Sequence, residues 1–205
     1  MSKTAEKIDF FNQLKSEYKA SVKAAFIETT PGQYLSIEGQ GAPGGQAMID
    51  SIGALYSMAF TIKMTRKAAR QEDYVICKLE TLWFTPDGGV NPDKFPQEQW
   101  CWILLIRTPD CVTQDDLNAA AKALLSKGKC EPVKNVKLKP LNEGKCVQIL
   151  HVGPYGQVGE AIEKMQALAA ENGLSFTGKH HEIYLSDPRR VAPEKLKTIV
   201  RRSIK

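Results

Sequence analysis

The two halves of the chain repeat one pattern of glycine and aliphatic residues, and this repetition constrains the fold more than any other feature. Two glycines and two aliphatic residues recur at identical spacing: Gly32, Leu35, Ile37 and Gly41, then Gly144, Val147, Ile149 and Gly153. After a one-residue shift, three apolar helix positions recur as well: Ile49, Ile52 and Leu55, then Ile162, Met165 and Leu168. Such self-similarity predicts a pair of similar supersecondary units. We therefore expect two strand-helix-strand modules related by a pseudo-twofold axis.

Local patterns supply the elements that these modules need. Alternating apolar residues predict strands at 33–39 and 181–185, and β-branched and aromatic residues predict strands at 73–84 and 100–107. A further strand is expected at 145–152. Helical spacing predicts helices near 46–61 and 157–172, and a capping-box pair at Thr113 and Asp116 predicts a third helix that ends at Gly128. The predicted fold class is α+β, with antiparallel sheets, helices on one face and a ligand cleft between the modules. The modules would span 21–110 and 111–205, after an amphipathic helix within 5–19.

Composition and charge fit a globular protein without a strongly basic surface. The 205 residues are 42% hydrophobic and 25% charged, and the net charge is +5. Much of the basic excess lies near the C-terminus, at Arg189, Arg190, Lys195, Lys197, Arg201, Arg202 and Lys205. Because no aromatic residue is interleaved there, we interpret this segment as a solvated helix face and expect no nucleic-acid partner. An interaction module that uses this basic segment is a minor alternative.

The cysteines and the N-terminus predict a cytoplasmic protein. Five widely spaced cysteines without a Cys-x-x-Cys pair support neither disulfides nor a zinc site, so buried structural thiols are the default interpretation: Cys77, Cys101, Cys111, Cys130 and Cys146. The polar N-terminus lacks the apolar stretch of a signal peptide. The longest apolar run, Trp100 to Ile106, is too short to cross a membrane. No membrane contact is expected, and the oligomeric state is left open.

The strand at 181–185 carries the most distinctive candidate site. Its alternation places Ile183 and Leu185 on one face and Glu182 and Tyr184 on the other. We expect the helices to cover the apolar face, which would leave Glu182 and Tyr184 at a cleft. Tyr155, in a Gly-Pro turn, would lie at the edge of this cleft, where its hydroxyl can donate a hydrogen bond.

A second glutamate would share that cleft. The repeat places Glu80 opposite Glu182, and four aromatic residues would line the groove: Trp83, Phe84, Trp100 and Trp102. Two carboxylates among aromatic faces favour a flat, apolar or cationic small molecule. Desolvation among aromatics would raise the pKa of such a carboxylate and strengthen it as a base. The alternative is that the glutamates are solvated or paired and the tryptophans belong to the core.

Other chemistries find less support in the sequence. The three histidines, His151, His180 and His181, can act as general bases, but none accompanies a recognisable nucleophile motif. The glycine-rich stretch at 39–45 lacks the spacing of a phosphate-binding loop, so a turn is the better interpretation.

Several blocks of the chain resemble the GyrI-like family of small-molecule-binding proteins over nearly its whole length. The most specific are His-Val-Gly-Pro-Tyr at 151–155 and His-Glu-Ile-Tyr-Leu-Ser-Asp-Pro at 181–188; a third is Lys-Leu-Glu-Thr-Leu-Trp-Phe at 78–84. In the third block the family pattern has Gly where this chain has Thr81, and Trp where it has Phe84. The resemblance implies tandem strand-helix-strand-strand modules and a cleft in which the residue matching Glu182 meets cationic or aromatic ligands.

Stand-alone relatives of this kind include hydrolases that open the strained ring of cyclopropanoid DNA-alkylating toxins. By this resemblance, Glu182 or Glu80 would be the general base, and Tyr155 or Tyr184 would bind the substrate carbonyl. The expected ligand-binding residues are Tyr184, Trp83, Phe84, Trp100, Trp102 and His181, with no metal or organic cofactor. The alternative is a non-catalytic protein that binds or sequesters aromatic or cationic xenobiotics, or that inhibits a partner.

Overall fold

A single antiparallel sheet of eight strands organises the computed structural model, which describes residues 7–91, 94–128 and 131–205. The strand order is β1-β6-β8-β7-β3-β4-β2-β5. The strands are β1 (Ala25–Glu28), β2 (Gly32–Gln40), β3 (Leu79–Phe84), β4 (Cys101–Thr108), β5 (Lys137–Leu141), β6 (Lys145–Val152), β7 (Phe176–Tyr184) and β8 (Lys197–Ile204). The α-helices are α1 (Phe10–Gln13), α2 (Lys15–Tyr18), α3 (Gln46–Ala68), α4 (Gln114–Ser126) and α5 (Gly159–Glu171). The predicted α+β class is confirmed, with one continuous sheet.

The sheet order shows the repeat directly. The unit β2-α3-β3-β4 corresponds to β6-α5-β7-β8, and the two units meet where β3 pairs with β7. Gly41 and Gly153, which the repeat aligns, both have left-handed backbones, with φ of 137° and 141°. Each unit also receives an edge strand from the segment that precedes the other unit, because β1 pairs with β6 and β5 pairs with β2. The sequence patterns did not predict these two short edge strands.

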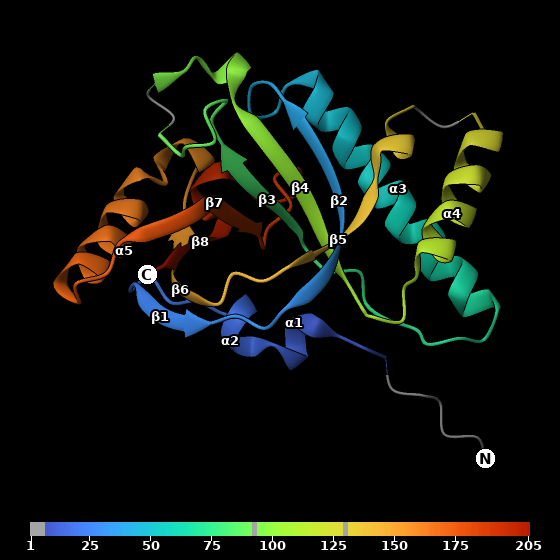
Figure 1. Ribbon diagram of the computed structural model, residues 1–205, viewed down its shortest axis with the longest axis horizontal. Coiled ribbons are helices and arrows are strands. Elements are labelled where there is room, and N and C mark those ends of the chain that lie inside the picture. Colours follow the sequence, from blue (N-terminus) through green and yellow to red (C-terminus); the bar gives the residue numbers. More distant parts are fainter. Residues whose placement is uncertain (1–6, 92–93, 129–130) are drawn as a thin grey trace.

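The three long helices share one face of the sheet (Figure 1). Helix α3 packs on β2 and β4 through residues such as Leu55 and Leu104, and α4 packs against α3. Helix α5 packs on β6 and β8 through Met165 and Val200. Helix α4 and strand β5 follow residue 110 but lie beside the first unit. The predicted boundary between the modules at residue 110 stays an interpretation.

The opposite face is covered by the N-terminal segment. Tyr18, from α2, packs there with Ile183 and Ile199. The single helix expected within 5–19 is two short helices instead, since Leu14 leaves helical geometry at φ −104° and ψ 56°; residues 5 and 6 lie outside the described part. Helices therefore contact both faces of the sheet.

Strand β8 overturns the interpretation of the basic C-terminal segment as a solvated helix face. Its residues Thr198, Ile199 and Val200 are fully buried, and Arg201 and Arg202 are only 1% and 6% exposed. This β-branched run favours a strand. Arg189 and Arg190, in the preceding loop, are exposed as expected.

Cysteine burial is mixed. Cys77 and Cys146 are buried free thiols, as predicted, but Cys101 and Cys111 are half-buried; Cys130 lies outside the described residues. Among the helices of the described chain, none combines the length and apolar character that a membrane span requires.

Candidate functional site

The register between β3 and β7 decides where the two candidate glutamates point. Thr81 lies opposite Glu182, and Glu80 lies opposite Ile183. Residues directly opposite each other share a face of the sheet, and successive residues alternate between faces. Glu80 and Glu182 therefore point to opposite faces, so the predicted groove that holds both carboxylates is wrong. A one-residue slip in the repeat alignment explains the error, because it turns every side chain to the other face.

Glu182 lies on the face that carries the long helices, between the areas covered by α3 and α5. The sequence pattern predicted that Glu182 would lie on the face without helices. Instead, Ile183 and Leu185 occupy the other face and pack under the N-terminal segment. Tyr184 Oη donates to Glu182 Oε2 at 2.8 Å, and Trp83 Nε1 lies 3.4 Å from the same oxygen. His180 Nε2 lies 3.0 Å from Oε1. We refer to His180, Glu182, Tyr184 and Trp83 as the Glu182 cluster.

These contacts hold Glu182 in its ionised form. Burial pushes the pKa of Glu182 upward, but hydrogen bonds from His180, Tyr184 and Trp83 outweigh it, so the pKa lies below its ordinary value. The expectation of a raised pKa is therefore wrong. At neutral pH the site presents a carboxylate only 6% exposed, which accepts hydrogen bonds and attracts positive charge.

Aromatic pairs flank the Glu182 cluster. Trp83 meets Trp100 edge to face with ring centres 6.1 Å apart, and Tyr184 meets Tyr155 in the same way at 5.3 Å. Burial and the charge of Glu182 raise the pKa of Tyr155, which keeps its hydroxyl protonated. That hydroxyl has no hydrogen-bond partner within the described ranges. The structure thus brings five of the predicted site residues together.

Three of the other four predicted site residues lie on the opposite face of the sheet. Glu80 and His181 are fully buried on the opposite face, and Phe84 shares that face, with the Lys179 ammonium 4.7 Å from its ring centre. Trp102 lies opposite Trp83 on the same face as Glu182, but it is 1% exposed and its ring occupies the space beside Gly39, so it belongs to the core under the cluster. The structure thus places Glu80, His181 and Phe84 away from the Glu182 cluster.

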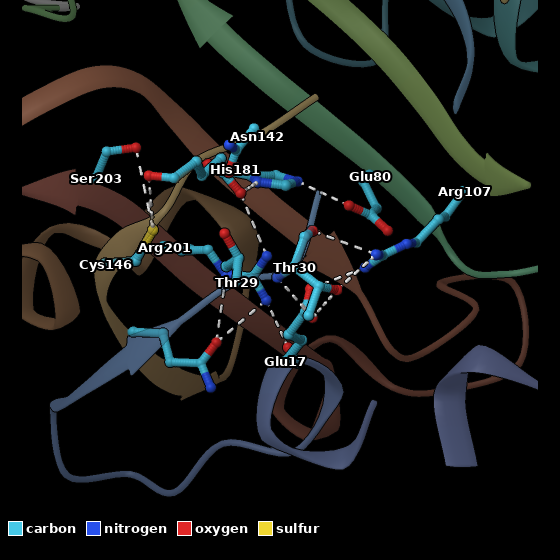
Figure 2. A network of polar contacts seen from close by, with 12 residues as sticks. Glu17, Thr29, Thr30, Glu80, Arg107, Asn142, Cys146, His181, Arg201 and Ser203 are labelled. Atoms are coloured by element: carbon cyan, nitrogen blue, oxygen red, sulfur yellow. Dashed lines mark hydrogen bonds and ion pairs between the residues drawn. The ribbon is translucent and has the colours of Figure 1, made fainter. Parts of the chain in front are cut away.

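Glu80 is instead part of a buried ionic network (Figure 2). Tyr18 Oη donates to Glu80 at 2.8 Å, and His181 bridges two carboxylates, with Nε2 2.9 Å from Glu80 and Nδ1 2.8 Å from Glu143. Arg201 Nη1 lies 3.3 Å from the same Glu143 oxygen. Burial lowers the pKa of His181, but Glu143 and Glu80 raise it to about 9. The imidazole is therefore protonated and donates from both nitrogens.

A neighbouring ion pair ties the N-terminal segment into this network. Arg107 Nη1 lies 2.8 Å from Glu17 Oε2, and both side chains are almost completely buried. Thr30 donates its backbone and hydroxyl hydrogens to the other Glu17 oxygen. We refer to seven residues as the Glu80 network: Glu17, Tyr18, Glu80, Arg107, Glu143, His181 and Arg201. Its burial and charge pairing indicate a structural anchor.

The residue of the Glu182 cluster that the sequence did not assign to the candidate site is His180. It was considered only as an unpartnered base, although its spacing of two residues from Glu182 places both on one face of a strand. That spacing was the available signal.

Two surface hollows lie away from the Glu182 cluster. The first, of about 170 Å³, is lined by Ser36, Glu38, Asn135 and Lys137; the second, of about 360 Å³, by Phe26, Ile27, Glu28, Lys145, Leu174 and Ile204. Neither contains a predicted site residue, so a ligand cleft between the modules stays a prediction. No group of histidine, cysteine or carboxylate side chains in the described ranges is arranged to hold a metal ion.

Comparison with known proteins identifies the family. The chain matches the GyrI-like small molecule binding domain over residues 25–201. An uncharacterized conserved protein from Listeria innocua is 34% identical, with 97% of this chain and 100% of that chain covered and a TM-score of 0.90. A hydrolase from Listeria innocua is 33% identical, with 97% and 100% covered and a TM-score of 0.86.

A more distant structure shares the fold alone. The EcmrR C-terminal domain is 12% identical, with 89% of this chain and 97% of that chain covered and a TM-score of 0.57. No curated protein sequence matches the chain significantly. The family match over most of the chain, together with the Listeria structures over 97% of it, shows that the protein belongs to the GyrI-like family of small-molecule-binding domains.

Proposed function

We propose that this protein is a hydrolase that acts on flat, electrophilic small molecules at the Glu182 cluster, with cyclopropanoid DNA-alkylating toxins as its substrate class. One observation carries the proposal: the nearly buried Glu182 carboxylate is kept ionised by three donors beside two aromatic pairs. Two structures described as hydrolases from Listeria innocua, each 33% identical over almost the whole chain, support the reaction class. The resemblance noted in the sequence supplies the substrate class.

The proposed reaction uses Glu182 as the general base. Glu182 accepts a proton from water while the water oxygen bonds to a carbon of the strained ring. The ring carbon–carbon bond breaks, its electron pair moves onto the conjugated carbonyl oxygen, and that oxygen takes up a proton. Tyr184 already donates to Glu182, so Tyr155 is the better donor to the carbonyl. Trp83 and Trp100 would hold the flat ring system.

The low pKa of Glu182 is compatible with this role. It makes the carboxylate a weaker base than the sequence suggested, but it ensures that the accepting form is present at neutral pH. Ring strain lowers the barrier that the base must help to overcome. Glu80 is a poor candidate for this step because its two oxygens are committed to Tyr18 and His181.

A second candidate function is binding without turnover. A carboxylate that is ionised at neutral pH next to aromatic faces also suits a flat organic cation, through countercharge and cation–π attraction. The protein would then sequester such molecules stoichiometrically.

Incubation with a cyclopropanoid alkylator, followed by mass spectrometry of the ring-opened product, separates the two functions. We expect multiple turnovers for the wild type and a loss of about a hundredfold or more in Glu182→Gln. Glu163→Gln, an exposed glutamate on α5, is the control and should match the wild type. Wild-type turnover in Glu182→Gln would exclude the carboxylate mechanism, whereas stoichiometric capture without product would favour the binding function.

A further inference from the structure

Thr81 is a buried polar residue beside Glu182 that the mechanism above does not use. It lies directly opposite Glu182 across the β3–β7 pair, on the same face of the sheet, and it is 0% exposed. Its Oγ1 makes no hydrogen bond to any atom of the described chain. Buried hydroxyls almost always have a partner, so an unpartnered one beside a candidate base points to a small polar molecule at that place.

Glu182 has hydrogen-bonding capacity that the cluster does not use. A carboxylate can accept about four hydrogen bonds, and the residues of the cluster supply three. Two of these go to Oε2, while Oε1 accepts only from His180. Oε1 can therefore accept one further hydrogen bond. The Thr81 side chain also interacts with the Tyr184 hydroxyl, outside full hydrogen-bond geometry, and this interaction lowers the pKa of Tyr184, although burial dominates and raises it.

We propose that Thr81 Oγ1 and Glu182 Oε1 together bind one ordered water molecule, and that this water is the nucleophile of the hydrolysis. This inference rests on the proposed function and adds a positioning residue to it. The water accepts a hydrogen bond from the Thr81 hydroxyl and donates one to Glu182, which satisfies the minimum of two polar partners that a buried water needs.

In the reaction, the hydrogen that faces Glu182 moves to the carboxylate as the water oxygen forms its bond to the ring carbon. The Thr81 hydroxyl keeps its own proton throughout and orients a lone pair of the water toward the substrate. Thr81 stands where the sequence pattern of the family has glycine, which has no hydroxyl to offer. The Thr81 hydroxyl therefore gives this chain a group that can position water, and a glycine at the same place would not.

The test combines crystal structures with kinetics for the wild type, Thr81→Val and Thr81→Ser. Valine preserves the shape and removes the hydroxyl, whereas serine retains it. We expect an ordered water within hydrogen-bond distance of residue 81 and Glu182 in the wild type and the serine variant, and none in the valine variant. With a cyclopropanoid alkylator, Thr81→Val should lower kcat by up to about a hundredfold with little change in KM, and Thr81→Ser should restore most of it.

Thr198→Val is the matched control. Thr198 is also fully buried with an unpartnered hydroxyl among the described residues, but it lies opposite Tyr184 on β8. The kcat of Thr198→Val should stay within about threefold of the wild type, because Thr198 lies opposite Tyr184 and not opposite Glu182. Equal losses in both valine variants would mean general loss of packing and overturn the inference.

The same data distinguish the two proposals. Turnover by a wild type that holds no such water, or by Thr81→Val at the wild-type rate, overturns the role of Thr81 and leaves the proposed function standing. A wild type that forms no product overturns the proposed function and the nucleophilic role, while the crystal structures still decide whether Thr81 binds water.

Discussion

Glu80 and Glu182 occupy neighbouring strands but have opposite surroundings. Glu80 is fully buried, and its partner His181 is a cation that also bridges Glu143. Glu182 is also buried, at 6% exposed, but two of its three donors, Tyr184 and Trp83, carry no charge. The difference teaches that the partners of a buried carboxylate, and the face of the sheet it occupies, separate a structural glutamate from a candidate functional one.

Charge balance explains why the Glu80 network is stable in the interior. Its three carboxylates face three cations: Glu17, Glu80 and Glu143 against Arg107, His181 and Arg201. Buried charges are tolerated when they are paired and hydrogen-bonded, and removal of one partner leaves the others uncompensated. The network also joins the N-terminal segment to both halves of the sheet. Its disruption should therefore affect folding before it affects ligand chemistry.

The sharpest test of this comparison is the same substitution at both glutamates. Glu80→Gln leaves His181 and Arg201 with one carboxylate fewer in a buried site, so we expect a loss of about 3–5 kcal/mol in the free energy of unfolding. Glu182→Gln should cost about 1 kcal/mol, because Tyr184 and Trp83 can still donate to the amide oxygen. Urea denaturation of both variants provides the measurement. Similar losses in the two would show that the distinction is wrong.

Alkaline pH should weaken the Glu80 network. The pKa of His181 is raised from 6.5 to about 9 in the folded protein. Its stabilising contribution is therefore full below pH 6.5 and is lost as the pH rises through about 9, by at most about 3 kcal/mol. The free energy of unfolding should decline over that range in the wild type, and much less in His181→Gln.

The adjacent histidine is the control for that pH dependence. His180→Gln alters the opposite face of β7 and should keep the alkaline decline of the wild type.

At acid pH the network weakens through Glu143, whose pKa is lowered from 4.5 to about 2 against the penalty of burial, mainly by His181 and Arg201. Its contribution is present above pH 4.5 and is lost as the pH falls through about 2. If the alkaline decline in the free energy of unfolding persists in His181→Gln, groups other than His181 cause that decline.

Two tyrosines offer a smaller, matched contrast, since each donates to one of the glutamates at 2.8 Å. Tyr18→Phe should lower the free energy of unfolding by about 1–2 kcal/mol and leave turnover unchanged, because it removes a buried donor from Glu80. Tyr184→Phe should lower turnover of a cyclopropanoid alkylator about tenfold with a smaller loss of stability. Reduced turnover in Tyr18→Phe at temperatures where it stays folded would connect the two faces functionally.

The sequence predicted the core of both units because those elements have strong local signals. The capping box at Thr113, for example, decides where α4 begins without help from distant residues. The edge strands β1 and β5 were missed because they are only four and five residues long, and β5 contains Pro140 and lysines. Their formation depends on pairing with the distant strands β6 and β2.

The candidate site was predicted in part, for a related reason. Glu182 and Tyr184 could be identified from one strand, whereas the position of Glu80 depended on the register between two strands. Register is a property of the assembled sheet, and an error of one residue reverses the face. His181 illustrates the same limit, because its partners Glu80 and Glu143 come from segments 101 and 38 residues away.

Two adjacent aromatics test the alternation on β3 with the smallest expected effects. Trp83 shares a face with Glu182, while Phe84 points to the opposite face. Trp83→Phe removes an N–H that lies 3.4 Å from Glu182, a long hydrogen bond, and narrows the stacking surface. We therefore expect affinity for a flat aromatic cation such as ethidium to fall about threefold to tenfold, which corresponds to roughly 1 kcal/mol. Phe84→Leu should leave the affinity within about twofold.

Fluorescence titration of both variants measures these affinities, and denaturation curves confirm that each is folded. Lys179 lies over the Phe84 ring, so Phe84→Leu should lose that cation–π contact and a few tenths of a kcal/mol of stability without touching the ligand site. If Phe84→Leu weakens ethidium binding more than Trp83→Phe does, the ligand occupies the opposite face. The assignment of the functional face to Glu182 would then be wrong, whatever the stability of the Glu80 network.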